Sequence, residues 1–195
     1  MDKIGIFGGT FDPIHFGHLI TAQAVLEKRN LDKIIFVPSF ISPHKINYSY
    51  SDPIHRMNMT KLATESNPKF IVSDFEINRS EISYTYNTLL EYSKTYEDME
   101  LIIGFDNLVV FDLWHKPDEI LNLVKLVVMK RTYDKEIKSP NKYFGEAEFV
   151  DTPTIEISAT EIREKISKKN SVEYFLPAKV IDYIKTNNLY SPYQI

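Results

Sequence analysis

Apolar residues along the chain form two kinds of segment, short continuous runs and longer stretches with helical spacing. The runs are rich in β-branched and aromatic residues and predict strands at residues 3–7, 33–37, 70–73, 100–104, 126–129 and 148–150. Residues 16–29 place Leu19, Ala22, Val25 and Leu26 at helical spacing and predict a helix between the first two strands. A strand, a helix and a strand within about 35 residues have the length of a right-handed parallel crossover. The pattern therefore predicts a parallel sheet.

Further helices are indicated by capping residues and by the apolar spacing that follows them. Asp52 and Pro53 are typical of an N-cap and a first helical position. Thr85 fits the N-cap of a helix that turns Leu90 inward. Arg56 could face either an active site or solvent, and the sequence leaves this open. Other helices are expected to end near residues 121–124 and to lie within residues 154–166 and 175–190.

Length and composition fit one α/β domain. The chain has 195 residues, of which 43% are hydrophobic, so we expect a single Rossmann-like, doubly wound domain over residues 1–195. The formal net charge of −4 argues against a nucleic-acid partner, and any anion site must therefore be local. Without cysteine there are no disulfides and no thiolate metal sites. No secretory signal and no apolar run near about 18 residues is found, so we expect a soluble cytoplasmic protein without a membrane partner.

The stretch GGTFDPIHFGHL, residues 8–19, follows the first strand and opens the first helix. Gly8 and Gly9 predict a tight turn that lets the backbone approach a ligand, and the first N–H groups of the helix attract an anion. His15 and His18 share one face of the first helical turn and can donate N–H bonds to phosphoryl oxygens. Paired glycines and single histidines are each common, but their combination indicates a phosphate site. The stretch is neither GxGxxG nor a P-loop.

This stretch resembles the (H/T)xGH motif of the nucleotidylyltransferase superfamily, in the form found in bacterial nicotinate-nucleotide adenylyltransferases. Two later strings are also similar to that family: ISATEIR, beginning at Ile157, and FLPAKVIDYIKTNNLY, residues 175–190. The resemblance therefore extends over essentially the whole chain. In ISATEIR, Ala159 replaces a family serine, from which we expect weaker nucleotide binding at most.

The resemblance implies a subsite for a mononucleotide acceptor. In the family the hydroxyl at Thr10 and a basic residue at Lys45 bind the acceptor phosphate, and the backbone at Thr85 binds the pyridine carboxylate. Trp114 matches the position whose indole stacks on the nicotinate ring. His115 stands where an aromatic residue such as Tyr is frequent, and its backbone N–H also binds the carboxylate.

The resemblance also implies a subsite for ATP. Gly104 and Asp106 would contact the ribose, and Ile157, Ser158 and Arg163 would hold the departing pyrophosphate. The residues expected to act in catalysis are His18, His15 and Arg163. The residues expected to bind ATP are Gly8, Gly9, His15, His18, Gly104, Asp106, Ile157, Ser158 and Arg163.

The implied reaction joins ATP and nicotinate mononucleotide to give deamido-NAD and pyrophosphate. Mg²⁺ is expected to arrive with ATP, and no dedicated metal site of the protein is predicted. Three alternatives stay open: preference for nicotinamide mononucleotide, an acceptor such as pantetheine phosphate or glycerol phosphate, and a dinucleotide sensor without catalysis. The sequence also leaves open whether the protein forms a homo-oligomer.

Overall fold

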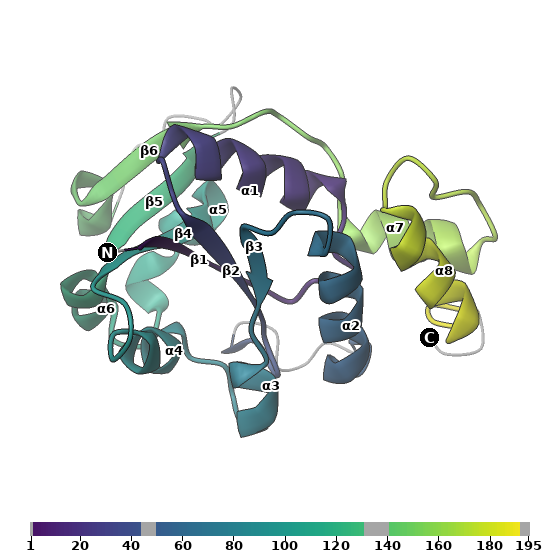
Figure 1. The fold of residues 1–195 in the computed structure, drawn as a ribbon, viewed down its shortest axis with the longest axis horizontal. Helices are drawn as coiled ribbons and strands as arrows, with labels where there is room; N and C mark the ends of the chain where they lie inside the picture. The colour runs from purple at the N-terminus through teal and green to yellow at the C-terminus, as the bar shows by residue number, and fades with distance from the viewer. Residues whose placement is uncertain (1, 44–49, 131–140, 192–195) are drawn as a thin grey trace.

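The structure is a computed structural model that describes residues 2–43, 50–130 and 141–191. Its centre is a six-stranded, entirely parallel sheet with the strand order β3-β2-β1-β4-β5-β6 (Figure 1). The strands are β1 (Lys3–Gly9), β2 (Lys33–Pro38), β3 (Phe70–Val72), β4 (Asp98–Gly104), β5 (Lys125–Lys130) and β6 (Ala147–Asp151). Each predicted strand is present, and the predicted doubly wound parallel fold is confirmed.

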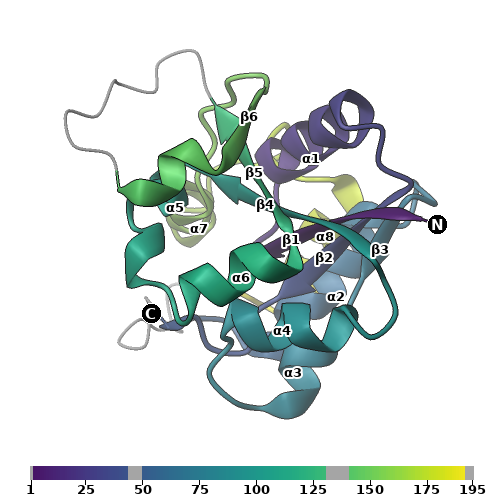
Figure 2. The same cartoon turned by 90° about the vertical axis from the view of Figure 1, so that its left-hand side faces the viewer.

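Helices lie on both faces of the sheet (Figures 1 and 2). The helices are α1 (Phe16–Lys28), α2 (Pro53–Thr64), α3 (Phe75–Arg79), α4 (Thr85–Tyr92), α5 (Phe105–Val109), α6 (Pro117–Leu123), α7 (Ala159–Ser167) and α8 (Ala178–Thr186), with short 3₁₀ turns η2 (Phe111–Leu113) and η3 (Lys142–Gly145). The sequence did not predict α3, α5 or the 3₁₀ turns, because segments of three to five residues are too short to show an apolar period.

The two faces of the sheet form separate hydrophobic cores. Alternate residues of β1 point to opposite faces, so that Phe7 packs with α1, α2, α7 and α8 while Ile6 packs with α4, α5 and α6. The helix after β1 therefore covers one face, and the helices after β4 cover the other. Because β1 and β4 are neighbours, a crevice opens between the carboxyl ends of these two strands.

A buried ion-pair cluster joins the strands at the other end of the sheet. The Glu100 side chain is 0% exposed, and both of its oxygens accept hydrogen bonds from Arg29, at 2.7 and 2.9 Å. Lys3 Nζ lies 2.9 Å from the same carboxylate. Burial alone would raise the pKa of Glu100, but the hydrogen bonds and charges of Arg29 and Lys3 together hold it below its ordinary value.

Glu100→Gln should lower the free energy of unfolding by about 3 kcal/mol at pH 7, because two cations lose their buried partner. Glu100 stabilises the fold above its unfolded pKa, and this contribution is lost as the pH falls through its lower folded pKa. The difference in the free energy of unfolding between variant and wild type should therefore shrink in acid. Urea unfolding of both proteins at several pH values measures this difference. The exposed ion-pair variant Glu161→Gln is the control, and an equal loss in both variants would contradict the assignment.

Candidate active site at the carboxyl ends of β1 and β4

A cavity of about 910 Å³ opens at the crevice between β1 and β4. It brings together predicted residues of both subsites. The predicted residues that line it are Gly8, Gly9, Thr10, Thr85, Gly104, Asp106, Trp114 and His115. Lys45 lies outside the described residues. The cavity thus contains most of the expected acceptor residues and the expected ribose-binding pair.

The two glycines at the end of β1 do not form the predicted tight turn. Gly8 and Gly9 are the last residues of the strand, and no glycine among the described residues has a positive φ. The chain turns instead at Phe11, which has a φ of 51°. A Cβ added to Gly9 would lie 2.8 Å from the Phe11 ring, whereas one added to Gly8 meets nothing within 4 Å. Gly9 is therefore required by the packing of Phe11, and Gly8 leaves space in the cavity.

His15 and His18 stand together at the start of α1, whose N-cap is His15. Their rings stack with centroids 3.7 Å apart, and the His15 backbone N–H donates to His18 Nδ1 at 3.3 Å. Because Nδ1 of His18 accepts this bond, the neutral ring carries its hydrogen on Nε2. A Cβ on Gly17 would lie 2.9 Å from His15 Nδ1, so a glycine directly before His18 leaves room for the His15 ring in the stack.

His15 is the more buried member of the pair. It is 6% exposed, and burial lowers the pKa of His15 to about 4. Among the described residues, no hydrogen-bond partner is found for its Nδ1. His15 is therefore neutral near pH 7, and it can donate to a phosphoryl oxygen without carrying a charge of its own.

The buried state of His15 should make the protein less stable in mild acid. Between pH 7 and 5 the unfolded chain binds a proton at this residue, and the folded chain does so only near pH 4. His15 should therefore contribute a loss of about 2 kcal/mol over this pH interval. Urea unfolding of wild type and His15→Asn at both pH values isolates the effect. Identical pH dependence in the two proteins would show that His15 is not buried in the neutral form.

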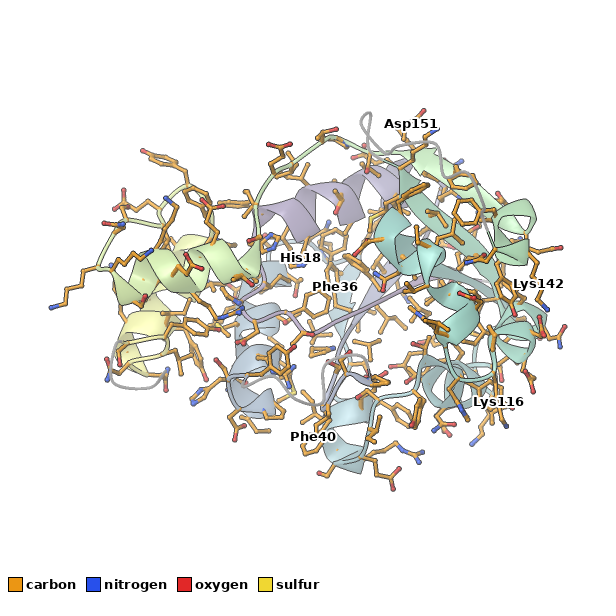
Figure 3. The ribbon with its side chains drawn as sticks, turned by 180° about the vertical axis from the view of Figure 1, so that it is seen from behind. His18, Phe36, Phe40, Lys116, Lys142 and Asp151 are labelled. Atoms are coloured by element: carbon orange, nitrogen blue, oxygen red, sulfur yellow. The ribbon has the colours of Figure 1, made fainter. Side chains whose placement is uncertain are left out.

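The start of α7 lies beside the start of α1. The connection after β6 passes over α1 and leads to α7, as Figure 1 shows, and Figure 3 shows His18 at the end of α1 that faces α7. The Phe16 backbone N–H donates to Phe175 O at 3.0 Å, which ties the α1 start to the segment between α7 and α8. Ser158 is the N-cap of α7, and its Oγ accepts from Glu161 N at 3.0 Å. The Ser158 side chain therefore caps the start of α7.

Arg163 extends from α7 to the loop before α1. Its Nη1 donates to Asp12 O at 2.7 Å and its Nη2 to Thr160 Oγ1 at 3.3 Å. These bonds account for two of the five guanidinium N–H groups. His15, His18, Ile157, Ser158 and Arg163 are not among the residues that line the cavity. The starts of α1 and α7 therefore form a second group of predicted residues, separate from the group that lines the cavity. Along the chain, Gly8 to Thr10 of the cavity wall lead into the loop before α1.

The part of the cavity wall that is expected to bind the mononucleotide acceptor differs in detail from the prediction. Tyr84, not Thr85, is the N-cap of α4, because Tyr84 has extended backbone angles and its carbonyl accepts from Asn87 N. Thr85 is thus the first helical residue, where a backbone N–H has no partner inside the helix. Leu90 is 44% exposed and does not point inward, since Thr88 and Leu89 are the buried residues of this short helix.

Two rings from the segment after η2 complete this wall. Trp114 is half-buried, and its ring centroid lies 5.0 Å from that of Phe111. The His115 ring lies 4.6 Å from the Tyr84 ring. Gly104, the last residue of β4, is the N-cap of α5, and a Cβ added there would lie 2.5 Å from Asp106 Oδ1. Glycine at this position therefore allows the Asp106 carboxylate to fold back toward the end of β4.

Sequence reasoning missed one acidic residue of the cavity and left one basic residue open. Glu76 lines the cavity, accepts from Thr88 Oγ1 at 2.6 Å, and has a pKa raised by burial. No motif marked it. Arg56 faces neither solvent nor the cavity: it is 1% exposed, and its guanidinium donates to four backbone carbonyls. Burial lowers the pKa of Arg56 and the charge of Asp12 opposes this, so the group stays charged.

Two further searches cover the described part of the chain. Within residues 2–43, 50–130 and 141–191, no cluster of three or more His, Asp or Glu side chains could hold a metal ion. In the same ranges, every helix is too short or too polar to cross a membrane.

Comparisons with known proteins agree with the geometry. A family model described as cytidylyltransferase-like matches residues 6–165. The chain is 42% identical to the nicotinate-nucleotide adenylyltransferase of Bacillus subtilis, over 97% of this chain and 99% of that one. It is 44% identical to the probable nicotinate-nucleotide adenylyltransferase of Caldicellulosiruptor bescii, over 96% and 98%.

Solved structures are similar in fold. The nicotinic acid mononucleotide adenylyltransferase of Plasmodium falciparum, complexed with NaAD, superposes with a TM-score of 0.78 at 23% identity. The superposition covers 97% of this chain and 98% of that chain. At this identity the similarity shows the fold alone.

Proposed function

Because the chain belongs to the cytidylyltransferase-like family and, within it, to the nicotinate-nucleotide adenylyltransferases, we infer that it transfers the adenylyl group of ATP to nicotinate mononucleotide. The products are deamido-NAD, the acid form of the dinucleotide, and pyrophosphate. One observation links this activity to the site: the starts of α1 and α7 lie beside a cavity with an aromatic wall. Two helix starts can hold a triphosphate, and the wall can hold a pyridine ring.

We propose that the mononucleotide occupies the part of the cavity bounded by α4 and Trp114. Its ring would stack on Trp114, and its carboxylate would accept N–H bonds from Thr85 and His115. Its phosphate would meet the Thr10 hydroxyl at the end of β1, with Lys45 as a further partner. Support comes from Thr85, the first residue of α4, whose backbone N–H has no partner inside the helix.

ATP would lie across the end of β4, with its ribose at Gly104 and Asp106. Its triphosphate would run past Gly8 and Gly9 toward the helix starts. The β- and γ-phosphates would meet the backbone at Ile157, the Ser158 hydroxyl and Arg163, which has N–H groups beyond the two that bind protein oxygens. Mg²⁺ would enter with ATP, held by phosphate oxygens and water.

The mononucleotide phosphate attacks the α-phosphorus in line, and pyrophosphate leaves on the opposite side. The attacking oxygen is already anionic near pH 7, so the reaction needs no general base and no covalent enzyme intermediate. His18, with its hydrogen on Nε2, would donate to an α-phosphoryl oxygen that gains charge in the transition state. Neutral His15 would support it from the adjacent stacked ring.

Product analysis tests the acceptor directly. Purified protein is incubated with magnesium-ATP and, separately, nicotinate mononucleotide, nicotinamide mononucleotide, pantetheine phosphate or glycerol phosphate. We expect a dinucleotide and pyrophosphate with nicotinate mononucleotide at the highest kcat/KM. A higher kcat/KM with nicotinamide mononucleotide would show that the amide is the preferred acceptor. Binding of dinucleotide without turnover of any acceptor would show that the protein is a sensor.

A further inference from the structure

Arg56 is buried beneath the loops that follow β1 and β2. Its Nη1 donates to Thr10 O at 2.8 Å and to Ser39 O at 2.6 Å, and its Nη2 donates to Phe40 O at 2.9 Å. Its Nε donates to Ser51 O at 3.0 Å, at the entry to α2. Four of its five N–H groups are thus used on backbone oxygens from the loop after β1 and from both ends of the connection between β2 and α2. The guanidinium fixes where the backbone of Thr10 lies relative to the end of β2.

Asp12 joins the same loop to a residue far along the chain. Its Oδ1 accepts from Tyr190 OH at 2.6 Å, across 178 residues of sequence, and its Oδ2 accepts from Ser51 N at 3.3 Å. The Asp12 carbonyl accepts from Arg163 at 2.7 Å. Asp12 and Tyr190 are 2% and 7% exposed, so these bonds are shielded from water. Asp12 therefore connects the loop before α1 with α7 and with the segment after α8.

We propose that Asp12, Arg56 and Tyr190 form a buried polar clamp that positions Thr10 and the turn leading to His15 for phosphoryl transfer. The proposal rests on the proposed function and adds positioning residues to it. None of the three is assigned to contact a substrate. They act by holding the backbone that carries the acceptor-phosphate residue on one side and the first catalytic histidine on the other.

The geometry of its guanidinium explains why the clamp positions the loop backbone as well as stabilising the fold. A planar guanidinium places its N–H groups at fixed angles, so four carbonyls bound to Arg56 have a fixed relative arrangement. A lysine at this position would keep the charge but has three donors on one atom. Displacement of Thr10 by a fraction of an ångström would misalign the attacking phosphate, and in-line transfer is sensitive to such shifts.

Tyr190→Phe is the sharpest variant, because it removes one hydroxyl and keeps the buried ring. We expect kcat to fall and the KM for nicotinate mononucleotide to rise, lowering kcat/KM for that substrate about tenfold or more. The KM for ATP should change less than the KM for nicotinate mononucleotide, since the ribose of ATP is assigned to Gly104 and Asp106, which the clamp does not contact. Rates are measured with magnesium-ATP at a temperature where urea unfolding shows the variant to be folded.

The matched control is Tyr143→Phe. Tyr143 is also a buried tyrosine, 3% exposed, and its hydroxyl donates to the Asp118 carboxylate at 3.0 Å, away from the phosphate loops. It should lose stability without change in kcat/KM. If Tyr190→Phe and Tyr143→Phe both keep wild-type kcat/KM, the hydroxyl bond is only structural and the proposal is wrong. If wild type itself makes no dinucleotide, the proposed function fails instead.

A double-mutant cycle tests whether the loss of kcat/KM comes from the Asp12–Tyr190 hydrogen bond. Asp12→Asn and Tyr190→Phe should each lower kcat/KM, and the double variant should be no worse than the more impaired single variant. Arg56→Lys should be impaired at least as strongly as Tyr190→Phe while it still binds ATP. Fully additive losses in the cycle would show that the two residues act independently and would overturn the clamp.

Discussion

His18→Ala should lower kcat by about 100- to 1000-fold, the size of the effect of removing one preorganised donor from a transition state. The His18 ring is oriented by the His15 backbone N–H, which donates to its Nδ1, and Nε2 carries the hydrogen that the phosphoryl oxygen would accept. The loss should appear mainly in kcat, because the bond strengthens as charge develops on the α-phosphoryl oxygens. Steady-state rates with magnesium-ATP and nicotinate mononucleotide measure it.

Conservative variants at this position separate the two ring nitrogens. A glutamine amide can reach the place of Nε2, whereas an asparagine amide is short and replaces only Nδ1. His18→Gln should therefore retain more activity than His18→Asn, which should resemble His18→Ala. His55→Ala is the control, since the His55 ring is hydrogen-bonded to Tyr183 of α8 and is assigned to neither subsite. Normal turnover of His18→Ala would remove His18 from the chemistry.

Trp114→Ala should raise the KM for nicotinate mononucleotide roughly 30-fold, on the scale of one lost stacking contact between an aromatic side chain and a planar ring. The KM for ATP should change by less than about threefold, because the ribose of ATP is assigned to Gly104 and Asp106 and not to Trp114. The KM of Trp114→Phe for nicotinate mononucleotide should lie between the values of the wild type and of Trp114→Ala. The exposed Tyr174→Ala is the control. Equal increases in both KM values would refute a stacking role.

The four inner strands, β2, β1, β4 and β5, were predictable because each is a largely apolar run that is buried in a parallel sheet. The edge strands β3 and β6 are more exposed. The helices that sequence reasoning missed are α3 and α5, of five residues each, which are held by the ends of the neighbouring strands and not by their own apolar spacing. The N-cap of α4 was displaced by one residue for a related reason. Its position depends on the extended backbone at Tyr84, and Tyr84 carries no capping signal.

The candidate site was predictable where short motifs carry it. Thr10, Thr85, Asp106, Trp114 and His115 all line one cavity, although they come from four separate segments of the chain. Contacts between distant segments were not predictable, because a single Arg or Tyr gives no periodic signal. Residues that support the site from beneath, such as Arg56, become visible only when the fold shows which carbonyls they bind.

The central claim is adenylyl transfer from the α-phosphorus of ATP to the mononucleotide in a single displacement. Two parallel incubations with nicotinate mononucleotide test it, one with ATP radiolabelled at the α-phosphate and one with ATP labelled at the γ-phosphate. We predict that the α-label appears in deamido-NAD and the γ-label in pyrophosphate, in equal amounts, with no label on the protein. Label retained on the protein, γ-label in the dinucleotide, or no labelled dinucleotide at all would contradict the account.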